Sequence, residues 1–476
     1  MEHAFRRIRQ GLIELDKIPE RVSREEFEVL IDPYASVAIA ALVPFTLRIE
    51  LEGWARSYYS LERHVEAILK YDHDKVPIPA TTAWYQTTQM VSKLFRSFDP
   101  VDTISYTEFD HVKWIQSSSA GYGYTGKKGD NDNYRIAKRT AVTIAEKLDH
   151  DREYGPEAIL NSTPDVAFTR TQLSQIKVKS KVRNVWGEAF HYVLLEGLFA
   201  DPLIEAFKGM DSFYFIGKNP LLSVPTLIED IVGSKDYIYQ FDWSSFDATV
   251  QEWELRFAFQ CLESMLRYPS NVEAQIWRFL VELFIYRKIA GPQGTLYLKT
   301  QGIPSGSCFT NIIGSTVNYV RIQYMFKSLT NEFATVYTHG DDSLAGVEST
   351  QYVPMDDFDK VCQPLRWTIN LSKSEVSRRK EGISFLSRTV REGMNAREEL
   401  VCLRMLKYPE YKVRSGAISA LRAQCISRDA GLNSHYLYKI FIYLRHKYGL
   451  SQELPFELRT WDLLEFESRR FSVSDL

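Results

Sequence analysis

The stretch VYTHGDDSLAGV, residues 336–347, decides the fold that we expect for this chain. β-branched and aromatic residues precede a polar turn and small apolar residues follow it, which predicts a β-hairpin with Gly340, Asp341 and Asp342 at its tip. Two adjacent carboxylates ~4 Å apart repel each other by ~4 kcal/mol at an effective dielectric near ~20, and a divalent cation would remove that cost. Asp after Gly is also ordinary turn chemistry. Other parts of the chain must therefore decide between a structural turn and a metal site.

Length and composition predict a large soluble protein. The 476 residues are 45% hydrophobic and 13% aromatic, which allows a large core and argues against extended disorder. The 58 basic and 61 acidic residues give a net charge of -3, so any affinity for nucleic acid must come from local basic patches. Five widely spaced cysteines predict neither a disulfide framework nor a zinc cluster. The N-terminal sequence is unlike a signal peptide and the longest apolar run is too short for a bilayer, so we expect an intracellular protein.

A loop rich in glycine and tyrosine, SSSAGYGYTGKKGDNDN at 117–133, nearly spells a P-loop. Position 128 is lysine where a P-loop needs Ser or Thr, and no helix follows at once as a dinucleotide-binding turn requires, so both matches are weak. A flexible loop of this composition can bind a single-stranded nucleic-acid backbone and stack bases, and a plain surface loop is the alternative. The candidate RNA-binding residues are Ser119, Gly121, Tyr122 and Lys127.

A basic stretch follows, QIKVKSKVRNVWG at 175–187. Alternate residues of a strand share a face, so a strand here would project four basic side chains together. These are Lys177, Lys179, Lys181 and Arg183. Such crowding is unfavourable without an anion, for which a nucleotide triphosphate is suitable, although lysines also protect edge strands.

Two further segments carry polar groups at the ends of elements. In DYIYQFDWSSFDATV, 236–250, a short strand ends at Asp242, and Asp247 lies near the start of a helix predicted over 252–268. Both carboxylates would lie at the same end of a sheet, although either could cap a helix.

The GIPSG loop, 302–306, is expected to open a helix whose first turns carry Ser305, Ser307, Thr310 and Asn311. Its glycines and the helix N-terminus favour a phosphate or a ribose oxygen, and a capped core helix is the alternative.

Taken in order, these segments resemble a viral RNA-dependent RNA polymerase, and in detail those of the partitiviruses, the cryptic viruses with double-stranded RNA genomes. The resemblance rests on SSSAGYGY, KVRNVWG, FDWSSFD, GIPSGSCFTNIIGSTVN, HGDDS and FLSR, and covers about 115–390. It implies an α+β right-hand fold of fingers, palm and thumb, with an antiparallel palm sheet backed by helices. The expected division is an N-terminal extension and start of the fingers at 1–110, fingers at 111–235 with 269–300 inserted, palm at 236–268 and 301–395, and thumb at 396–476.

The resemblance also implies the roles of individual residues. Asp242 and Asp341 would hold two Mg²⁺ ions, with Asp342 assisting and Mn²⁺ able to substitute, and Lys373 would protonate the departing pyrophosphate. The implied nucleotide-binding set is Lys179, Lys181, Arg183, Asp247, Ser305, Gly306, Thr310 and Asn318. Within it, Asp247, Ser305 and Thr310 would contact the ribose. Many relatives carry asparagine where this chain has Gly314, so Asn318, one helical turn further on, and Asn311 are the two candidates for the remaining ribose contact.

The activity implied by the resemblance is transcription and replication of a double-stranded RNA genome. The implied partners are NTPs, a single-stranded RNA template, a double-stranded RNA product and a viral capsid protein, without a membrane, in the virion interior and the host cytoplasm. One alternative is a reverse transcriptase, against which Asp247 argues, because such enzymes exclude the 2′-hydroxyl with a bulky residue at that place. The other is a non-catalytic RNA-binding structural subunit, against which the complete carboxylate set argues.

Overall fold

A computed structural model describes residues 11–19, 29–56, 58–151, 154–178 and 181–453. Its centre is a four-stranded antiparallel sheet with the order β11-β12-β7-β13. The strands are β7 (Tyr237–Gln240), β11 (Thr335–His339), β12 (Asp342–Val347) and β13 (Glu375–Ser377). This arrangement confirms the predicted hairpin and antiparallel sheet.

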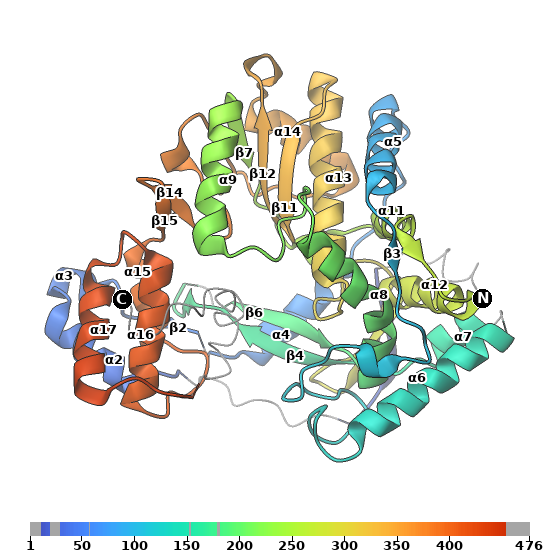
Figure 1. The fold of residues 1–476 in the computed structure, drawn as a ribbon, viewed down its shortest axis with the longest axis horizontal. Coiled ribbons are helices and arrows are strands. Elements are labelled where there is room, and N and C mark those ends of the chain that lie inside the picture. The colour runs from blue at the N-terminus through green and yellow to red at the C-terminus, as the bar shows by residue number, and fades with distance from the viewer. Residues whose placement is uncertain (1–10, 20–28, 57, 152–153, 179–180, 454–476) are drawn as a thin grey trace.

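Alternation along β7 explains why helices cover both faces of this sheet. Ile238 packs into the apolar cluster of α9 (Pro220–Ser234), whereas the ring of the next residue, Tyr239, contacts Phe326 and Phe358. Those two rings belong to α13 (Thr310–Thr330) and α14 (Met355–Cys362). Figure 1 shows α9 on one side of the strands and α13 on the other. Because helices cover both faces of the sheet, side chains at the ends of its strands are better placed to reach solvent and a ligand.

A second sheet has the order β1-β10-β9-β4-β6 and lies below the first in Figure 1. Its strands are β1 (Leu12–Lys17), β4 (Asp165–Thr171), β6 (Val182–Gly187), β9 (Arg287–Ala290) and β10 (Thr295–Lys299). The β9–β10 pair confirms the hairpin predicted at 287–300. The pairing of β4 with β9 is parallel and the other pairings are antiparallel.

Helices pack around the two sheets and share one large apolar core with the first. They are α4 (Leu61–Leu69), α5 (Thr82–Ser97), α6 (Asn133–His150), α7 (Tyr154–Leu160), α8 (Phe190–Lys208), α10 (Phe246–Thr249), α11 (Glu252–Glu263) and α12 (Asn271–Ile285). The helix predicted over 252–268 ends early, because β8 (Leu266–Arg267) leaves it to pair with β3 (Val101–Asp102). Within the described residues, no helix has the length and apolar character that crossing a membrane requires.

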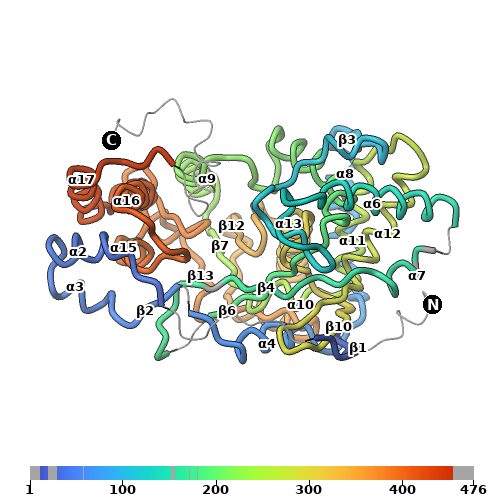
Figure 2. Tube along the Cα trace, turned by 90° about the horizontal axis from the view of Figure 1, so that it is seen from below, coloured from blue at the N-terminus to red at the C-terminus, as the bar shows by residue number. Residues whose placement is uncertain are grey.

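The C-terminal helices pack against a segment from near the start of the chain. Figures 1 and 2 show α15 (Glu399–Lys407), α16 (Gly416–Ala430) and α17 (His435–Tyr448) beside α2 (Pro33–Leu42) and α3 (Phe45–Ile49). These helices share an apolar cluster, and buried Asp32 pairs with Arg422 and accepts a hydrogen bond from Ser419 at 2.7 Å. The segment from 33 to 49, which lies within the predicted N-terminal extension and start of the fingers, therefore packs with the C-terminal helices.

Two short pairs complete the described strands. β2 (Trp54–Ala55) pairs with β5 (Ser174–Gln175), and β14 (Thr389–Arg391) pairs with β15 (Met394–Ala396). The residues FLSR lie before β14, where Leu386 and Ser387 both have positive φ and Phe385 bridges to Arg388. That tight turn returns the chain toward the end of the first sheet.

Candidate active site

The tip of the β11–β12 hairpin carries the predicted carboxylates. His339 pairs with Asp342, so Gly340 and Asp341 form a two-residue loop. Gly340 has φ 60°, which suits the first central position of a type II′ turn and keeps the hairpin tight. The Asp341 side chain is exposed and that of Asp342 is half-buried.

Strand register brings Asp242 to the same place. Ala345 of β12 pairs with Tyr239 of β7, and three positions further along the two antiparallel strands Asp342 and Asp242 are level. The backbone of Asp242 is held by the chain before β13: its N–H donates to Ser374 Oγ at 2.9 Å, and its carbonyl accepts from the Asn370 N–H at 2.7 Å. Carboxylates separated by 100 positions therefore meet at one end of the sheet.

The crowding of these carboxylates alters their acidity. Burial raises the pKa of Asp342 to about 7; repulsion from Asp341 adds to the rise, and the Leu386 N–H, 3.0 Å from Oδ2, opposes it. Although Asp341 is exposed by surface area, the protein around its carboxylate displaces water and raises its pKa, with Arg183 opposing and Asp242 adding to the rise. Crowded carboxylate oxygens are hard, anionic ligands, the kind that Mg²⁺ and Mn²⁺ prefer. The residues at this end of the sheet fit a divalent metal.

Asp247 belongs to the same electrostatic neighbourhood. It lies in the short helix α10, and its carboxylate accepts a hydrogen bond from Ser305 Oγ. Burial raises the pKa of Asp247 to about 6; the Ser305 hydroxyl opposes the rise, Asp341 adds to it and Arg183 opposes it. Residues from three separate predicted motifs therefore interact at one site.

The 302–306 loop depends on glycine for its close approach to β6. Gly306 has φ 133°, and a Cβ there would lie 2.3 Å from the carbonyl oxygen of Trp186. The Ser305 carbonyl accepts from the Trp186 N–H at 2.7 Å. Any side chain at position 306 would push this loop away from β6 and move Ser305 from Asp247.

The helix after this loop begins later than predicted. Its first residue is Thr310, so Ser305 and Ser307 precede the helix instead of lying in its first turns. The reason is local: the Thr310 hydroxyl accepts from the Gly306 N–H at 3.2 Å and donates to the Pro304 carbonyl at 2.9 Å. Thr310 thus closes the loop on itself, and its hydroxyl is engaged within the protein.

The single strand predicted over 175–187 is wrong. β5 ends at Gln175 and β6 begins at Val182, because β5 pairs with β2 whereas β6 pairs with β4, so the chain must turn between them. Lys177 lies in that turn, Lys181 lies just before β6, and Lys179 lies outside the described residues. The predicted common basic face does not form among the described residues.

Arg183 is the basic residue that the structure places toward the carboxylates. It is in β6, and it influences the pKa of both Asp341 and Asp247. The Gln172 amide, with its oxygen turned toward the guanidinium, accepts two hydrogen bonds from Arg183 at 2.9 and 3.0 Å. The sequence offered no signal for Gln172, which lies three residues before the basic stretch and is ordinary in type.

Asn318 has a position that contradicts the predicted ribose contact. Its side chain is fully buried, and its Oδ1 accepts from the Trp243 indole N–H at 2.8 Å. Its Nδ2 donates to the carbonyls of Gly340 and Asp342 at 3.0 and 3.3 Å. The amide therefore links the chain after β7 to the hairpin tip.

Asn311, the other candidate, also supports the hairpin. Its Oδ1 accepts from the Tyr214 hydroxyl, and its Nδ2 lies 3.4 Å from His339 Nε2. His339 Nδ1 in turn lies 2.8 Å from the Phe215 carbonyl, as a donor in the neutral ring. Burial lowers the pKa of His339, which favours that neutral ring. Both asparagines are thus used in positioning the turn.

The remaining predicted residues lie in surface turns. Lys373 is exposed in the turn before β13, directly before the Ser374 that holds Asp242. The loop at 117–133 has contacts of its own: Ser119 bridges to Lys127, and the Gly121 N–H donates to Ser119 Oγ at 3.2 Å. Asn133 donates to the carbonyls of Thr125 and Lys127, which fixes the loop further. Tyr122 is half-buried and Lys127 is exposed.

Comparison with known proteins places this arrangement in a family. Residues 30–445 match the sequence profile of the family described as viral RNA-dependent RNA polymerase. The RNA-directed RNA polymerase of Cryptosporidium parvum virus 1 (strain KSU-1) is 31% identical over 223 residues, which are 44% of this chain and 38% of that protein. That of white clover cryptic virus 1 (isolate Boccardo/2004) is 21% identical over 283 residues, 50% of this chain and 44% of that protein. The matched segments thus span less than half the length of these relatives.

Solved structures show the same fold. The crystal structure of the RNA-dependent RNA polymerase of a human picorbirnavirus superposes with a TM-score of 0.66 at 16% identity, covering 93% of this chain and 88% of that one. The right-hand polymerase fold and the likeness to partitivirus polymerases are confirmed. Polymerases of this family use divalent metal ions. The chain belongs to the viral RNA-dependent RNA polymerase family.

Proposed function

We propose that this protein is an RNA-directed RNA polymerase that transcribes and replicates a double-stranded RNA genome. The observation that carries the proposal is the meeting of Asp242, Asp341 and Asp342 at one end of the β11-β12-β7-β13 sheet. The hydrogen-bonded pair of Asp247 and Ser305 lies within their electrostatic reach. Carboxylates and a ribose-reading pair at one site are what nucleotidyl transfer from NTPs needs.

The proposed division assigns 236–268 and 301–395 to the palm, 111–235 and 269–300 to the fingers, and 396–476 to the thumb. The contacts of α2 and α3 with α15, α16 and α17 support adding the segment from 33 to 49 to the thumb layer. The pairing of β1 with β10 supports adding residues 12–17 to the fingers sheet. Residues near the start of the chain thus contribute to both the proposed thumb and the proposed fingers.

The proposed metals are two Mg²⁺ ions, for which Mn²⁺ can substitute, held by Asp242, Asp341 and Asp342. Such a pair lowers the pKa of the attacking 3′-hydroxyl and neutralises charge on the triphosphate. The protein's part is to position these carboxylates, which the hydrogen bonds of Asn318 and Ser374 do through the backbone. Leu386 adds a direct hydrogen bond to the Asp342 carboxylate.

The nucleotide is proposed to lie between Arg183 and the Asp247–Ser305 pair. A guanidinium binds phosphate oxygens bidentately, and Gln172 already fixes the orientation of Arg183. Asp247 would accept a hydrogen bond from the ribose 2′-hydroxyl, while Ser305 fixes the carboxylate. Lys181, Gly306 and Thr310 support this pocket, and Lys373 is kept as the proposed proton donor to pyrophosphate. Ser119, Gly121, Tyr122 and Lys127 are proposed to contact the RNA template.

The proposed partners are NTPs, a single-stranded RNA template, its double-stranded product and a viral capsid protein. The proposed place of action is the virion interior and the host cytoplasm. The capsid protein and the location follow from the resemblance to partitiviruses.

The test is template copying by the purified chain. With Mg²⁺ or Mn²⁺ and a single-stranded RNA template, the protein should convert NTPs into product of template length and should use 2′-deoxynucleotides poorly. A clear preference for deoxynucleotides would instead indicate a reverse transcriptase. RNA binding without synthesis on any template would indicate a structural subunit.

A further inference from the structure

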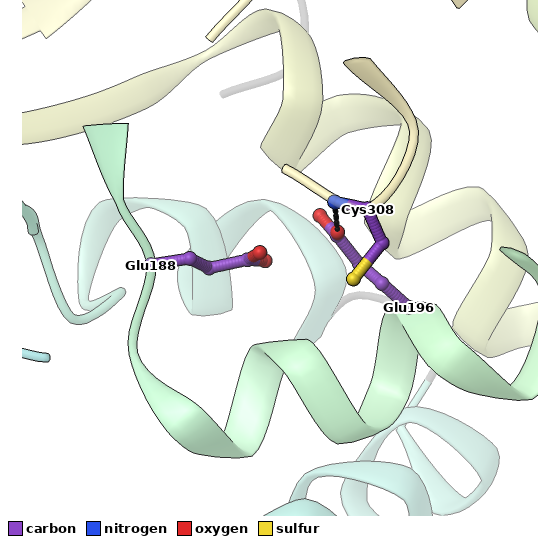
Figure 3. A group of neighbouring side chains, drawn as sticks. All are labelled: Glu188, Glu196 and Cys308. Carbon is purple, nitrogen blue, oxygen red and sulfur yellow. Dashed lines mark hydrogen bonds between the residues drawn. The ribbon is translucent and has the colours of Figure 1, made fainter. Parts of the chain in front are cut away.

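A second group of metal-binding side chain types lies outside the proposed active site. It consists of Glu188, which follows β6, Glu196 in α8, and Cys308, which precedes α13. One ligand atom from each residue lies within 4.8 Å of the other two. Figure 3 shows the Glu188 carboxylate and the Cys308 sulfur directed toward each other beside the Glu196 carboxylate.

Glu188 is the member of this group whose carboxylate is not satisfied by hydrogen bonds. It is 5% exposed, and neither carboxylate oxygen has a hydrogen-bond partner. Its nearest cation is Arg287, whose Nη1 lies 3.6 Å from Oε1. A buried carboxylate without hydrogen bonds is costly, so a further group is required to satisfy these oxygens.

The neighbouring cations are already engaged elsewhere. The Arg287 guanidinium lies 3.2 Å from Asp165 and 3.1 Å from Glu196, so one guanidinium faces three carboxylates. Lys128 interacts electrostatically with Glu188 and Cys308, but its ammonium donates to Ser118 Oγ at 2.7 Å. Neither cation hydrogen-bonds to Glu188.

Glu196 is held in place by different contacts. Its oxygens accept from Ser307 Oγ at 2.9 and 2.8 Å, and from the Cys308 N–H at 2.8 Å. These bonds fix Glu196 against the segment that carries Cys308, while they leave the Cys308 sulfur facing Glu188. Two of the three proposed ligand residues, Glu196 and Cys308, are therefore already held next to each other.

We propose that Glu188, Glu196 and Cys308 bind a divalent cation of the zinc type. Tetrahedral ligand atoms at ~2.0–2.3 Å from one Zn²⁺ ion lie about 3.3–3.8 Å apart, so atoms within 4.8 Å of one another need to close by roughly 1–1.5 Å at most. The thiolate sulfur selects zinc over Mg²⁺, which prefers oxygen ligands. On binding, Cys308 loses its thiol proton to solvent as the sulfur–metal bond forms.

Such a cation would join three separate parts of the chain. Glu188 lies next to the strand that contacts Ser305, Glu196 belongs to α8, and Cys308 lies three residues after Ser305. The bound metal would hold the 302–306 loop against β6 and α8. The proposal does not depend on the polymerase assignment, because it uses none of the three aspartates.

The test is the metal content of the purified full-length chain after incubation with Zn²⁺ and removal of weakly bound metal. Elemental analysis should find about one zinc per chain, and Glu188→Gln and Cys308→Ala should each reduce it to below about a tenth. Cys261→Ala, which removes a buried thiol elsewhere, should retain the zinc. With Co²⁺ instead of Zn²⁺, a sulfur-to-cobalt charge-transfer band should appear in the wild type and in Cys261→Ala, and not in Cys308→Ala.

The competing account is a proton shared between Glu188 and Glu196. Since glutamine imitates a protonated carboxyl group, that account predicts that Glu188→Gln keeps or raises the Tm, whereas the zinc site predicts that it lowers the Tm of zinc-loaded protein. A wild-type chain that binds no zinc and shows no cobalt–sulfur band would overturn the proposal, whether or not the variants fold.

Discussion

Replacing Asn318 with alanine separates the observed role of this residue from the predicted one. The substitution leaves the buried Trp243 N–H without an acceptor and removes a donor from the carbonyls of Gly340 and Asp342. A buried donor without a partner costs ~1–3 kcal/mol, and with two weakened carbonyls we expect a total loss of about 2–4 kcal/mol. At ~2.1 cal/mol/K per residue, a chain of 476 residues loses about 1 °C of Tm per kcal/mol, so the Tm should fall by roughly 2–4 °C.

The same substitution should slow catalysis without changing sugar selection. Because Asn318 supports the hairpin tip and does not face the nucleotide, kcat should fall while the ratio of NTP to 2′-dNTP incorporation stays constant. The matched control is Gln323→Ala on the same helix, where a buried amide bonds both backbone groups of Ala334. It should lower the Tm by a similar amount and leave kcat unchanged below the Tm. An Asn318→Ala variant with wild-type Tm and relaxed sugar selection would refute this reasoning.

Three further predictions concern other contacts. Asp247→Ala should reduce the preference for NTP over 2′-dNTP in kcat/KM by about 10–100-fold, the worth of a lost hydrogen bond to a charged group; an unchanged ratio would exclude Asp247 from the ribose contact. Arg183→Lys keeps the charge but loses the bidentate fork, so KM for NTP should rise by about tenfold, and Gln172→Ala should raise it less; equal KM values in all three proteins would count against the phosphate role. Asp32→Ala removes the carboxylate that pairs with the buried Arg422 guanidinium and should cost ~3–5 kcal/mol in thermal unfolding, so an unaltered Tm would show that the pair is not needed there.

The sequence predicted those parts of the site that depend on residues close together in the chain. A two-residue turn with glycine first, flanked by alternating apolar residues, has few structures open to it, so the Gly340–Asp341 turn followed directly. Asp242 lies two residues after β7, and antiparallel pairing sets it opposite Asp342. The antiparallel sheet and the meeting of Asp242 with the hairpin were implied by the resemblance to viral polymerases, because periodicity alone does not say which strands pair.

The errors have equally physical causes. The alternation of lysines in the stretch from 175 to 187 contains no information about which strands pair with it. Because β5 pairs with β2 and β6 pairs with β4, the stretch is not one strand. Periodicity could not assign Asn318, because every residue of α13 from Ile312 to Phe326 is buried and the helix has no polar face to read. The docking of α2 on α16 and α17 joins segments almost 400 positions apart, for which local pattern contains no information.

Glu196 is a signal in the sequence for a buried ion pair. It is the one acidic residue in the apolar run FHYVLLEGLFA, and such a charge inside a buried helix requires a partner. That pattern predicts a buried partner for Glu196, and the structure identifies it as Arg287 together with Ser307 and the Cys308 N–H.

The most direct test of the central claim is single-nucleotide incorporation by Asp341→Asn. The substitution keeps the size of the side chain but removes the charge at the tip of the hairpin, so with Mg²⁺ and a primed RNA template the rate should fall by about 100–1,000-fold. Asp356→Asn, at an exposed position in the first turn of α14, should incorporate nucleotides at the wild-type rate. Incorporation by Asp341→Asn within a few-fold of wild type would contradict the assignment of this end of the sheet as the catalytic centre.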